Sequence, residues 1–315
     1  MSARVVLHLP DDHRARLEAG ETGTLYARIR QAVATRGGTV VLRNRFPQIE
    51  PDGDLHIVDN ARRPHPDTLI SAQAYLDGCW HLDPEGVLAD SSIAGRAFDP
   101  ASVDPEAAAA CLARLRHRYV APRHSRYHQK RAREEIDPSG VVIFLQGPPP
   151  YVRGHAHLGR EEMIRTVVAG AGGRPVYVKP HPLRKEEGVA IIRRLRAEGL
   201  PLNRTNANVH DLLSQAAVTV SANSAASFEG FLHGTPAILF ARADFAAMAE
   251  VVTQAAAFPA ALARALATPR DYAPFLSWYL SQCLWPGAPD FEARLFAIFG
   301  AAGFDADRLG LAAAG

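Results

Sequence analysis

The sequence predicts an α/β protein made of two domains with parallel sheets. The chain has 315 residues, which is long enough for two domains that each bury their own core. In both halves, short apolar runs alternate with helical stretches, and this alternation is typical of βαβ units. A polar and charged stretch, residues 121–139, has prolines near both ends and separates the two halves. We therefore expect two Rossmann-like domains with a boundary near residue 137.

The first half, residues 1–137, shows the pattern of a Rossmann-like domain. Strands are expected at 5–9, 39–42 and 55–58, with a helix at 25–34. Asp104, Pro105 and Glu106 combine an N-cap, an N1 proline and an acidic first turn, which predicts a helix over 107–119. Pro122 is expected to end that helix.

The second half repeats the alternation more clearly. We expect strands at 141–145, 176–178, 218–220 and 237–240, and helices near 160–170, 186–198, 208–216 and 225–233. Beyond Phe245 the pattern becomes helical, with segments at 246–257, 259–267, 271–284 and 290–299. The expected second domain is 138–270, and residues 271–315 form C-terminal helices. The aromatic residues of those helices, Trp278, Tyr279, Trp285 and Phe291, are expected in a core.

Composition indicates a soluble, cytoplasmic protein without a metal centre. Hydrophobic residues make up 47% of the chain and charged residues 22%, and no apolar stretch reaches the length of a membrane span. The first residues, Met1–Val5, lead into a strand and do not resemble a signal peptide. Cys79, Cys111 and Cys283 are far apart and lack the spacing of metal ligands, so we expect reduced thiols and no zinc site.

Net charge is +2, but one segment is strongly basic. The run Arg114–Arg133 contains eight Lys or Arg residues and no acidic residue. Such a run can attract anionic lipid head groups, an acidic glycan or nucleic acid. A solvated helix face and linker is the more common role of a charged run and is the favoured interpretation. Nucleic-acid binding ranks last, because no aromatic stacking platform accompanies the run.

Polar residues follow two of the expected strands in the second half. Val176–Val178 leads into Lys179-Pro180-His181-Pro182, and Val218–Val220 leads into Ser221-Ala222-Asn223-Ser224. Ligands of open α/β sheets bind outside the carboxyl ends of the strands, so these junctions are the candidate site. Ser224 is a suitable N-cap for the following helix, whose free N–H groups favour an anion such as a phosphate.

His181 and Glu229 have different predicted roles at this site. The prolines on both sides of His181 restrict its backbone, so its imidazole can donate to a phosphate oxygen or protonate a leaving group. A structural hydrogen bond at a strand end is the alternative. His65 has the same Pro-His-Pro surroundings but follows no clear strand, so a turn is expected there. Glu229 would repel a phosphate and is expected to accept hydrogen bonds from sugar hydroxyls, with ribose as the natural candidate.

Four further candidates keep two interpretations each. Asn223 either occupies a position with positive φ or donates its amide to the nucleotide. Gln146, at the end of the 141–145 strand, either binds the acid sugar or caps a proline turn. Asp11 and Asp12 follow the first strand and could supply a base or nucleophile for glycosyl transfer, although a helix cap is favoured.

These motifs resemble a known family. Lys179–Pro182, Ser221–Glu229 and Gly234–Phe240 resemble the nucleotide-binding half of GT-B glycosyltransferases. More narrowly, they are similar to the bacterial capsule polysaccharide family that transfers Kdo, an eight-carbon acidic sugar, from CMP-Kdo. Val141–Gln146 and Trp80–Ser92 extend the resemblance, which covers roughly residues 75–245. The sequence departs from the family after Gln146, where Gly147-Pro148-Pro149-Pro150 replaces an expected acidic residue.

The resemblance implies a GT-B fold, in which two Rossmann-like domains face a cleft and the C-terminal helices cross back to the first domain. It implies a retaining, CMP-sugar-dependent glycosyltransferase that needs neither a metal nor another cofactor. The nucleotide sugar is expected on the second domain, bound by Gln146, Lys179, His181, Ser221, Asn223, Ser224 and Glu229. The acceptor, a glycolipid or oligosaccharide, is expected on the first domain, with peripheral contact to the inner membrane or a capsule export complex.

Other functions remain open on the same fold. A CDP-polyol phosphotransferase or a sialyltransferase would use nearly the same second domain. A catalytically silent GT-B subunit could instead serve as a scaffold in a capsule assembly complex. The donor nucleotide and the effect of replacing His181 distinguish these alternatives.

Overall fold

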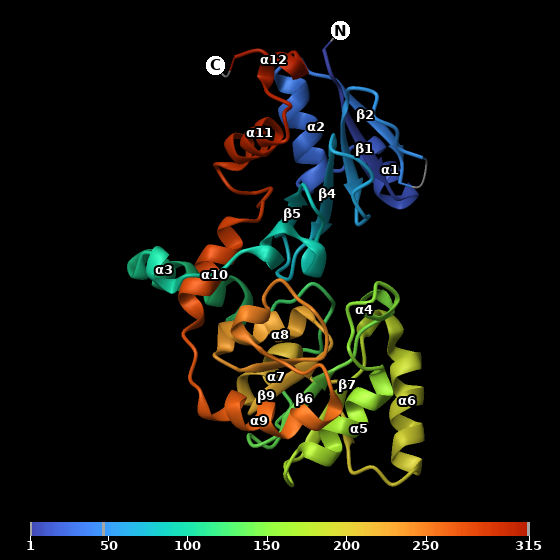
Figure 1. Cartoon of the computed structure of the whole chain (residues 1–315), viewed down its shortest axis with the longest axis vertical. Helices are drawn as coiled ribbons and strands as arrows, with labels where there is room; N and C mark the ends of the chain where they lie inside the picture. The colour runs from blue at the N-terminus through green and yellow to red at the C-terminus, as the bar shows by residue number, and fades with distance from the viewer. Residues whose placement is uncertain (1, 46–47, 314–315) are drawn as a thin grey trace. The chain divides into compact units, whose positions relative to one another are not determined.

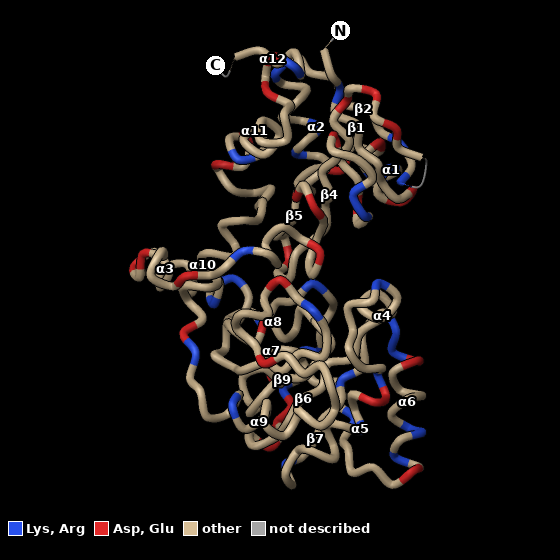
Figure 2. The backbone as a smooth tube through the Cα atoms, viewed as in Figure 1, with Lys and Arg blue, Asp and Glu red and all other residues tan. Residues whose placement is uncertain are grey.

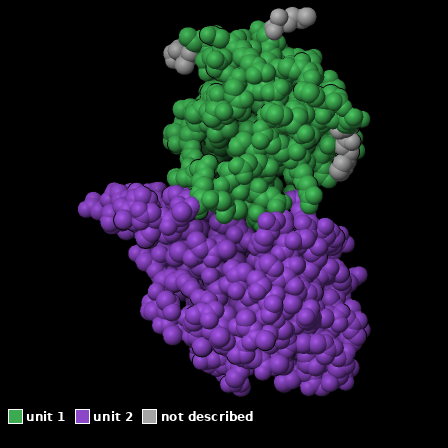
Figure 3. Space-filling model, in the orientation of Figure 1, with its two compact units in different colours: residues 1–96, 280–315 green, residues 97–279 purple. Residues whose placement is uncertain are grey.

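The chain folds into two α/β units. The computed structural model describes residues 2–45 and 48–313, which form two compact units (Figure 3). Each unit has its own sheet. The first unit combines residues 1–96 with 280–315, and the second comprises residues 97–279. Each unit is described here by itself.

The first unit is built on a five-stranded sheet with the order β2-β1-β3-β4-β5 (Figure 1). Its strands are β1 Val5–Leu9, β2 Val40–Asn44, β3 Leu55–Asp59, β4 Thr68–Gln73 and β5 Trp80–Asp83. The first four strands run parallel, and β5 is antiparallel to β4. The sequence analysis predicted the first three strands and missed β4 and β5.

Helices cover one face of this sheet. They are α1 Asp11–Glu18, α2 Leu25–Thr35, α11 Phe291–Ala301 and α12 Ala306–Leu309. Leu7 on β1, Ile29 on α2 and Leu295 on α11 are fully buried in one apolar cluster, which explains why α2 and α11 lie against the sheet (Figure 1). Residues 280–315 thus belong to the core of the first unit although they are distant in sequence.

The opposite face of the first sheet carries a buried pair of histidines. Strand side chains alternate between faces, so His8 and His56 lie on the face away from Leu7. The Nε2 of His8 is 2.9 Å from the Nδ1 of His56, and the Nε2 of His56 is 3.0 Å from a carboxylate oxygen of Asp52. Burial, and then the proximity of His56, lower the pKa of His8 to about 4.

The second unit has a six-stranded sheet with the order β11-β10-β9-β6-β7-β8, parallel at every pairing (Figure 1). The strands are β6 Val141–Phe144, β7 Val176–Lys179, β8 Asn203–Arg204, β9 Val218–Ser221, β10 Ala237–Leu239 and β11 Glu250–Val251. The four strands predicted in this half are β6, β7, β9 and β10.

Helices cover both faces of the second sheet. The helices of this unit, of which α3 and α10 lie away from the sheet (Figure 1), are α3 Pro105–Leu115, α4 Pro149–Val152, α5 Arg160–Gly170, α6 Lys185–Ala197, α7 Val209–Gln215, α8 Ala225–Gly230, α9 Phe258–Ala267 and α10 Tyr272–Ser281. Ile143 packs with α5, α6 and α9 on one face, whereas its neighbours Val142 and Phe144 pack with α7 on the other. The charged residues of α6 are separated along the helix: Glu186 and Glu187 lie in its first turn and Arg194 and Arg196 in its last turn, as the helix dipole favours (Figure 2).

Two predictions about this part of the chain differ from the structure. The helix expected at 246–257 is wrong, because the segment instead forms 3₁₀ turns on either side of β11. Val251 pairs with β10 and Val252 is fully buried, and β-branched residues favour such a strand. Segment 121–139, where the boundary was expected, lies within the second unit. Arg123 pairs with Asp211, and the N–H of Ile136 donates to Gln215, which attaches the segment to that unit.

Residues 2–45 and 48–313 contain neither a membrane-spanning helix nor a metal-binding cluster. No helix among them is long and apolar enough to cross a membrane. No group of three or more His, Cys, Asp or Glu side chains among them is arranged to hold a metal ion.

The His8–His56 contact predicts an acid-sensitive stability. The folded pKa of His8 is lowered from 6.5 to about 4, so between these values the unfolded chain binds more protons. Stability should therefore fall as pH decreases from about 6.5 to 4, by up to about 3 kcal/mol for this group. The measurement is the thermal unfolding midpoint against pH. In His8→Gln the acid-side slope should be shallower than in the wild type. The exposed control His117→Gln should keep the wild-type slope, and equal slopes in all three would contradict the role of His8.

Candidate functional site

The candidate site lies at the carboxyl edge of the second sheet. Strand β6 is central, with β7 on one side and β9 on the other, and Phe144 is in register with both Lys179 and Ser221. Since neighbouring strands are spaced about 4.8 Å apart, the ends of β7 and β9 are separated by roughly 10 Å, with the end of β6 between them. The residues that follow these three strands, among them Gln146, His181 and Asn223, therefore belong to one edge of the sheet.

Gln146 holds the loop after β9 through two hydrogen bonds to Asn223. The backbone N–H of Asn223 donates to Oε1 of Gln146 at 2.7 Å, and Nε2 of Gln146 donates to Oδ1 of Asn223 at 3.1 Å. The Asn223 amide also donates to the carbonyl of Arg242 at 2.8 Å. Asn223 does not have a positive φ, so that interpretation of it was wrong. The pair fixes the loop that leads into α8, and whether either residue contacts a donor stays a prediction.

The two serines of this loop differ in exposure and role. Ser221 is fully buried, and its hydroxyl accepts from the N–H of Ser224 at 3.0 Å and lies 2.8 Å from the hydroxyl of Ser227. Ser221 therefore shapes the turn from inside the unit. Ser224 is the N-cap of α8, as predicted, and its hydroxyl oxygen accepts from the N–H of Ala226 at 3.2 Å. Its own hydrogen is directed away from that bond, so Ser224 can still donate to an anion.

His181 is held as a neutral hydrogen-bond donor. It caps the 3₁₀ turn Pro182–Arg184, where the N–H of Leu183 donates to Nδ1 of the imidazole at 3.2 Å. An Nδ1 that accepts carries no hydrogen, so in the neutral ring the hydrogen is on Nε2. Burial, followed by the nearby Arg184 charge, lowers the pKa of His181 below its usual value. At neutral pH, His181 is therefore a neutral ring that donates a hydrogen bond through its Nε2–H group and does not carry a second proton.

Lys179 is a partly desolvated cation at the end of β7. Its ammonium donates to the carbonyl of Ala207 and lies 3.5 Å from Oε1 of Gln129. Burial lowers its pKa from 10.5 to about 8, although Glu134 opposes the shift. Lys179 is thus charged at neutral pH but close enough to titration for the pH to matter.

Glu229 is buried on α8 beside a pair of histidines. The hydroxyl of Ser125 donates to Oε1 of Glu229 at 3.1 Å, and Nε2 of His210 lies 3.9 Å from Oε2. His210 directs that nitrogen to the carbonyl of His124 at 2.8 Å, and its Nδ1 is 3.0 Å from Nε2 of His233. Burial lowers the pKa of both histidines, that of His233 to about 4, so neither neutralises Glu229 at neutral pH.

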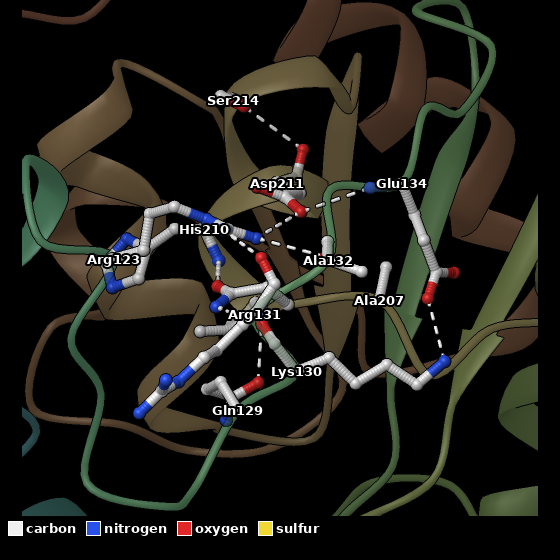
Figure 4. Close-up of polar contacts among 12 residues, drawn as sticks. Arg123, Gln129, Lys130, Arg131, Ala132, Glu134, Ala207, His210, Asp211 and Ser214 are labelled. Atoms are coloured by element: carbon white, nitrogen blue, oxygen red, sulfur yellow. Dashed lines mark hydrogen bonds and ion pairs between the residues drawn. The ribbon is translucent and has the colours of Figure 1, made fainter.

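A loop closed by Arg123 lies over this edge of the sheet, and we name residues 123–132 the Arg123 loop. The guanidinium donates to Asp211 at 2.5 Å and to the carbonyls of Arg131 and Ala132, so it joins the two ends of the loop (Figure 4). Asn208 donates to the carbonyl of Lys130, and the N–H of Val209 donates to Gln129. Arg123 and Lys130 therefore use their charges within the unit, where Lys130 pairs with Glu134 (Figure 4). The interpretation of the basic run as a solvated face therefore does not account for Arg123 and Lys130, which form ion pairs within the unit.

Sequence analysis did not find the contacts of this loop with the site. Ser125 contacts Glu229, Tyr127 lies edge-on to His181 with ring centroids 5.4 Å apart, and Gln129 contacts Lys179. The three residues are spaced two positions apart, but the chain bends at 126–127 and forms no strand there, so the spacing alone does not predict these contacts.

Asp11 and Asp12 lie in the first unit, in the first turn of α1. Pro10 is the N-cap of that helix, so the interpretation of the two aspartates as caps was wrong. Both are largely exposed, and they pair with Arg14 and Arg16 of the same helix. Acidic residues in a first turn are stabilised by the helix dipole. Their predicted part in catalysis stays a prediction.

The stretch Trp80–Ser92 of the resemblance is organised by Asp83. Its carboxylate accepts from the N–H groups of Glu85 and Gly86, at 2.8 and 3.1 Å, and from the hydroxyl of Ser92 at 2.7 Å. A side chain at Gly86 would lie 2.5 Å from the carbonyl oxygen of Asp90, so only glycine fits this turn. Asp83 is therefore engaged in holding its own loop.

Two solved structures have a similar fold over most of the chain. The chain is similar to "Thermosulfurimonas dismutans KpsC, beta Kdo 2,4 transferase", with a TM-score of 0.57 and 17% identity over 88% of this chain and 90% of that chain. It is also similar to the beta Kdo 2,7 transferase of KpsC from the same organism, with a TM-score of 0.51 and 11% identity over 80% of this chain and 84% of that chain. No protein-family model matches the chain, and no curated protein does. The chain has a GT-B-like fold, as the sequence predicted.

The ion pair between Arg123 and Asp211 should be important for stability. The side chains are only 18% and 9% exposed, and removal of one partner leaves a mostly buried charge. We expect Arg123→Ala to lower the free energy of unfolding by about 2 to 4 kcal/mol. The measurement is urea unfolding followed by circular dichroism. The exposed Arg133→Ala in the same segment is the matched control and should change the free energy by less than about 0.5 kcal/mol. Equal effects of the two substitutions would contradict this assignment.

Proposed function

We propose that the chain is a glycosyltransferase that moves an acidic sugar, Kdo from CMP-Kdo, to a surface glycan of capsule type or a glycolipid. The observation that supports the proposal is that a neutral imidazole donor, a partly buried ammonium and a helix-capping hydroxyl follow strands that end at one edge of the sheet. The fold shared with Kdo transferases supports it. We also propose that the chain belongs to a family of capsule polysaccharide enzymes.

In this proposal the second unit binds the CMP phosphate. Lys179 supplies positive charge, while Nε2–H of His181 and the hydroxyl of Ser224 supply hydrogen bonds. When the sugar leaves, negative charge grows on the phosphate, and donors already oriented toward it stabilise the transition state. Because the pKa of His181 is lowered, we assign it hydrogen bonding to the leaving phosphate and not proton transfer. These groups compensate the phosphate charge without a metal or another cofactor.

Glu229 is assigned to the ribose of CMP. A carboxylate only accepts hydrogen bonds, and a ribose presents two adjacent hydroxyl donors. The neutral state of His210 leaves the Glu229 carboxylate as an acceptor. Gln146 and Asn223 hold the loop before α8, and Ser221 supports it from inside.

The acceptor is assigned to the first unit, with Asp11 or Asp12 as base or nucleophile. The exposed carboxylates of these residues follow β1 at the carboxyl edge of the first sheet, where ligands of α/β proteins bind. The proposed acceptor is a glycolipid or oligosaccharide at the inner membrane face, which makes the enzyme peripheral to the membrane. CDP-glycerol or CMP-sialic acid as the bound donor would instead favour a CDP-polyol phosphotransferase or a sialyltransferase.

Replacement of His181 tests the proposed activity. His181→Ala removes the Nε2–H donor and should lower the transfer rate at least about 100-fold and weaken CMP binding by about tenfold. The measurements are release of CMP from CMP-Kdo and calorimetric titration with CMP. His128→Ala, an exposed histidine of the Arg123 loop, is the control and should leave both unchanged. Full complementation of capsule assembly by His181→Ala would favour a scaffold.

The pKa of Lys179 predicts the pH dependence of CMP binding. The phosphate of CMP becomes dianionic above about pH 6, and Lys179 loses its charge as pH rises through about 8. Affinity for CMP should therefore be highest between these values and should fall on the alkaline side. In Lys179→Met the alkaline decrease should disappear, and affinity should be lower throughout. The measurement is the dissociation constant from pH 5 to 9.5. An alkaline decrease that persists in Lys179→Met would assign it to another group.

A further inference from the structure

We propose that Ser125 is a positioning residue for Glu229 and that, through it, the Arg123 loop makes the site selective for ribonucleotides. This inference rests on the proposed function, because it takes Glu229 as the group that meets the ribose. The sequence places the site at the ends of two strands, and in this proposal the Arg123 loop forms a third side of the site. It also assigns a role to part of the basic run that differs from lipid or glycan binding.

The first step is the direction of the loop side chains. Ser125, Tyr127 and Gln129 are alternate residues, and each contacts one of the three side chains assigned to the nucleotide. The contacts are the 3.1 Å hydrogen bond to Glu229, the ring contact at 5.4 Å with His181 and the 3.5 Å contact with Lys179. The loop therefore contacts all three assigned side chains at once. A chance contact at the surface would be expected to involve one of them, not all three.

The second step is the rigidity of the loop. Arg123 fixes one end to Asp211 and to the carbonyls of the other end, and Glu134 donates its backbone N–H to the same carboxylate at 3.3 Å (Figure 4). The carbonyl of His124 accepts from His210, directly before Ser125. Residues 125–128 lie between these anchored positions, because Gln129 is bound by Val209. A short arc between fixed ends has few conformations, so it can hold a hydroxyl at a defined place.

The third step is the chemistry at Glu229. The Ser125 hydroxyl donates to Oε1, and a hydrogen bond to a charged acceptor restricts the rotation of a carboxylate. His210 directs its Nε2–H to the carbonyl of His124, whereas Ser125 directs its hydroxyl to Glu229. A carboxylate fixed in this way can accept from the adjacent ribose hydroxyls with little loss of entropy. A 2′,3′-dideoxyribose lacks both donors, and its binding should not depend on the orientation of Glu229.

A comparison of two ligands and two proteins tests the proposal. Calorimetry would give the dissociation constants of CMP and 2′,3′-dideoxy-CMP for the wild type and Ser125→Ala. Ser125→Ala should weaken CMP by about three- to tenfold and change 2′,3′-dideoxy-CMP by less than about twofold. In a Glu229→Gln background, Ser125→Ala should have no further effect on CMP. Ser125→Thr keeps the hydroxyl and should restore CMP affinity, whereas His128→Ala should alter neither ligand.

The outcomes separate this inference from the proposed function. Equal weakening of both nucleotides would show that Ser125 only supports the fold and would overturn the inference. Tighter CMP binding by Ser125→Ala would show that its hydroxyl competes with the ribose, which also overturns it. If the wild type binds neither nucleotide, the CMP donor itself is wrong and both proposals fall. Should Ser125→Ala not fold, the Ser125→Thr and Ser125→Cys variants give the same comparison, with the cysteine expected to behave as the weaker donor.

Discussion

The ion pair between Arg123 and Asp211 is the interaction on which the candidate site depends. Asp211 lies on α7, which packs against one face of the second sheet, so the pair connects the Arg123 loop to the core. Arg123 has a φ of 55°, a left-handed conformation that costs a non-glycine residue roughly 1 kcal/mol or more. Its bonds to Asp211, Arg131 and Ala132 offset that cost. The strained residue is thus stable only where the carboxylate and both carbonyls converge.

Polar residues at the sheet edge divide into those that build the loops and those left to meet a ligand. Ser221 and Gln146 use their polar atoms on Ser224, Ser227 and Asn223, so they determine where the cap of α8 lies. A buried polar group must be paired, and such pairs make the shape of a loop specific. The exact place of Ser224 is therefore a product of side chains that need no ligand contact. Function at this edge depends on both classes of residue.

The sequence predicted the parts of the fold that depend on local pattern. Buried parallel strands read as apolar runs, and β6, β7, β9 and β10 were found on that basis. Segment 246–257 was predicted to be a helix because its alanines favour one. It contains strand β11 instead, because the strand pairs with β10 and Val252 is buried. The cap at Ser224 followed from residue preference. The role of Ser125 did not, because it depends on a contact with Glu229, 104 residues away. Long-range pairing of this kind is not encoded in any local spacing.

The hydrogen bond from Leu183 to His181 decides which chemistry the proposed site can perform. A backbone N–H directed at Nδ1 disfavours a hydrogen on that nitrogen, and burial disfavours the charged ring, so both effects keep the imidazole neutral. A neutral donor lowers the energy of growing negative charge without giving up its hydrogen. Positive charge must then come from Lys179, whose own burial brings its pKa to about 8. Burial and the Leu183 hydrogen bond together give the two groups different properties: the ammonium supplies charge, and the neutral imidazole supplies a hydrogen bond. The proposed departure of a nucleoside monophosphate needs charge stabilisation more than a proton, and this is what the two groups can supply.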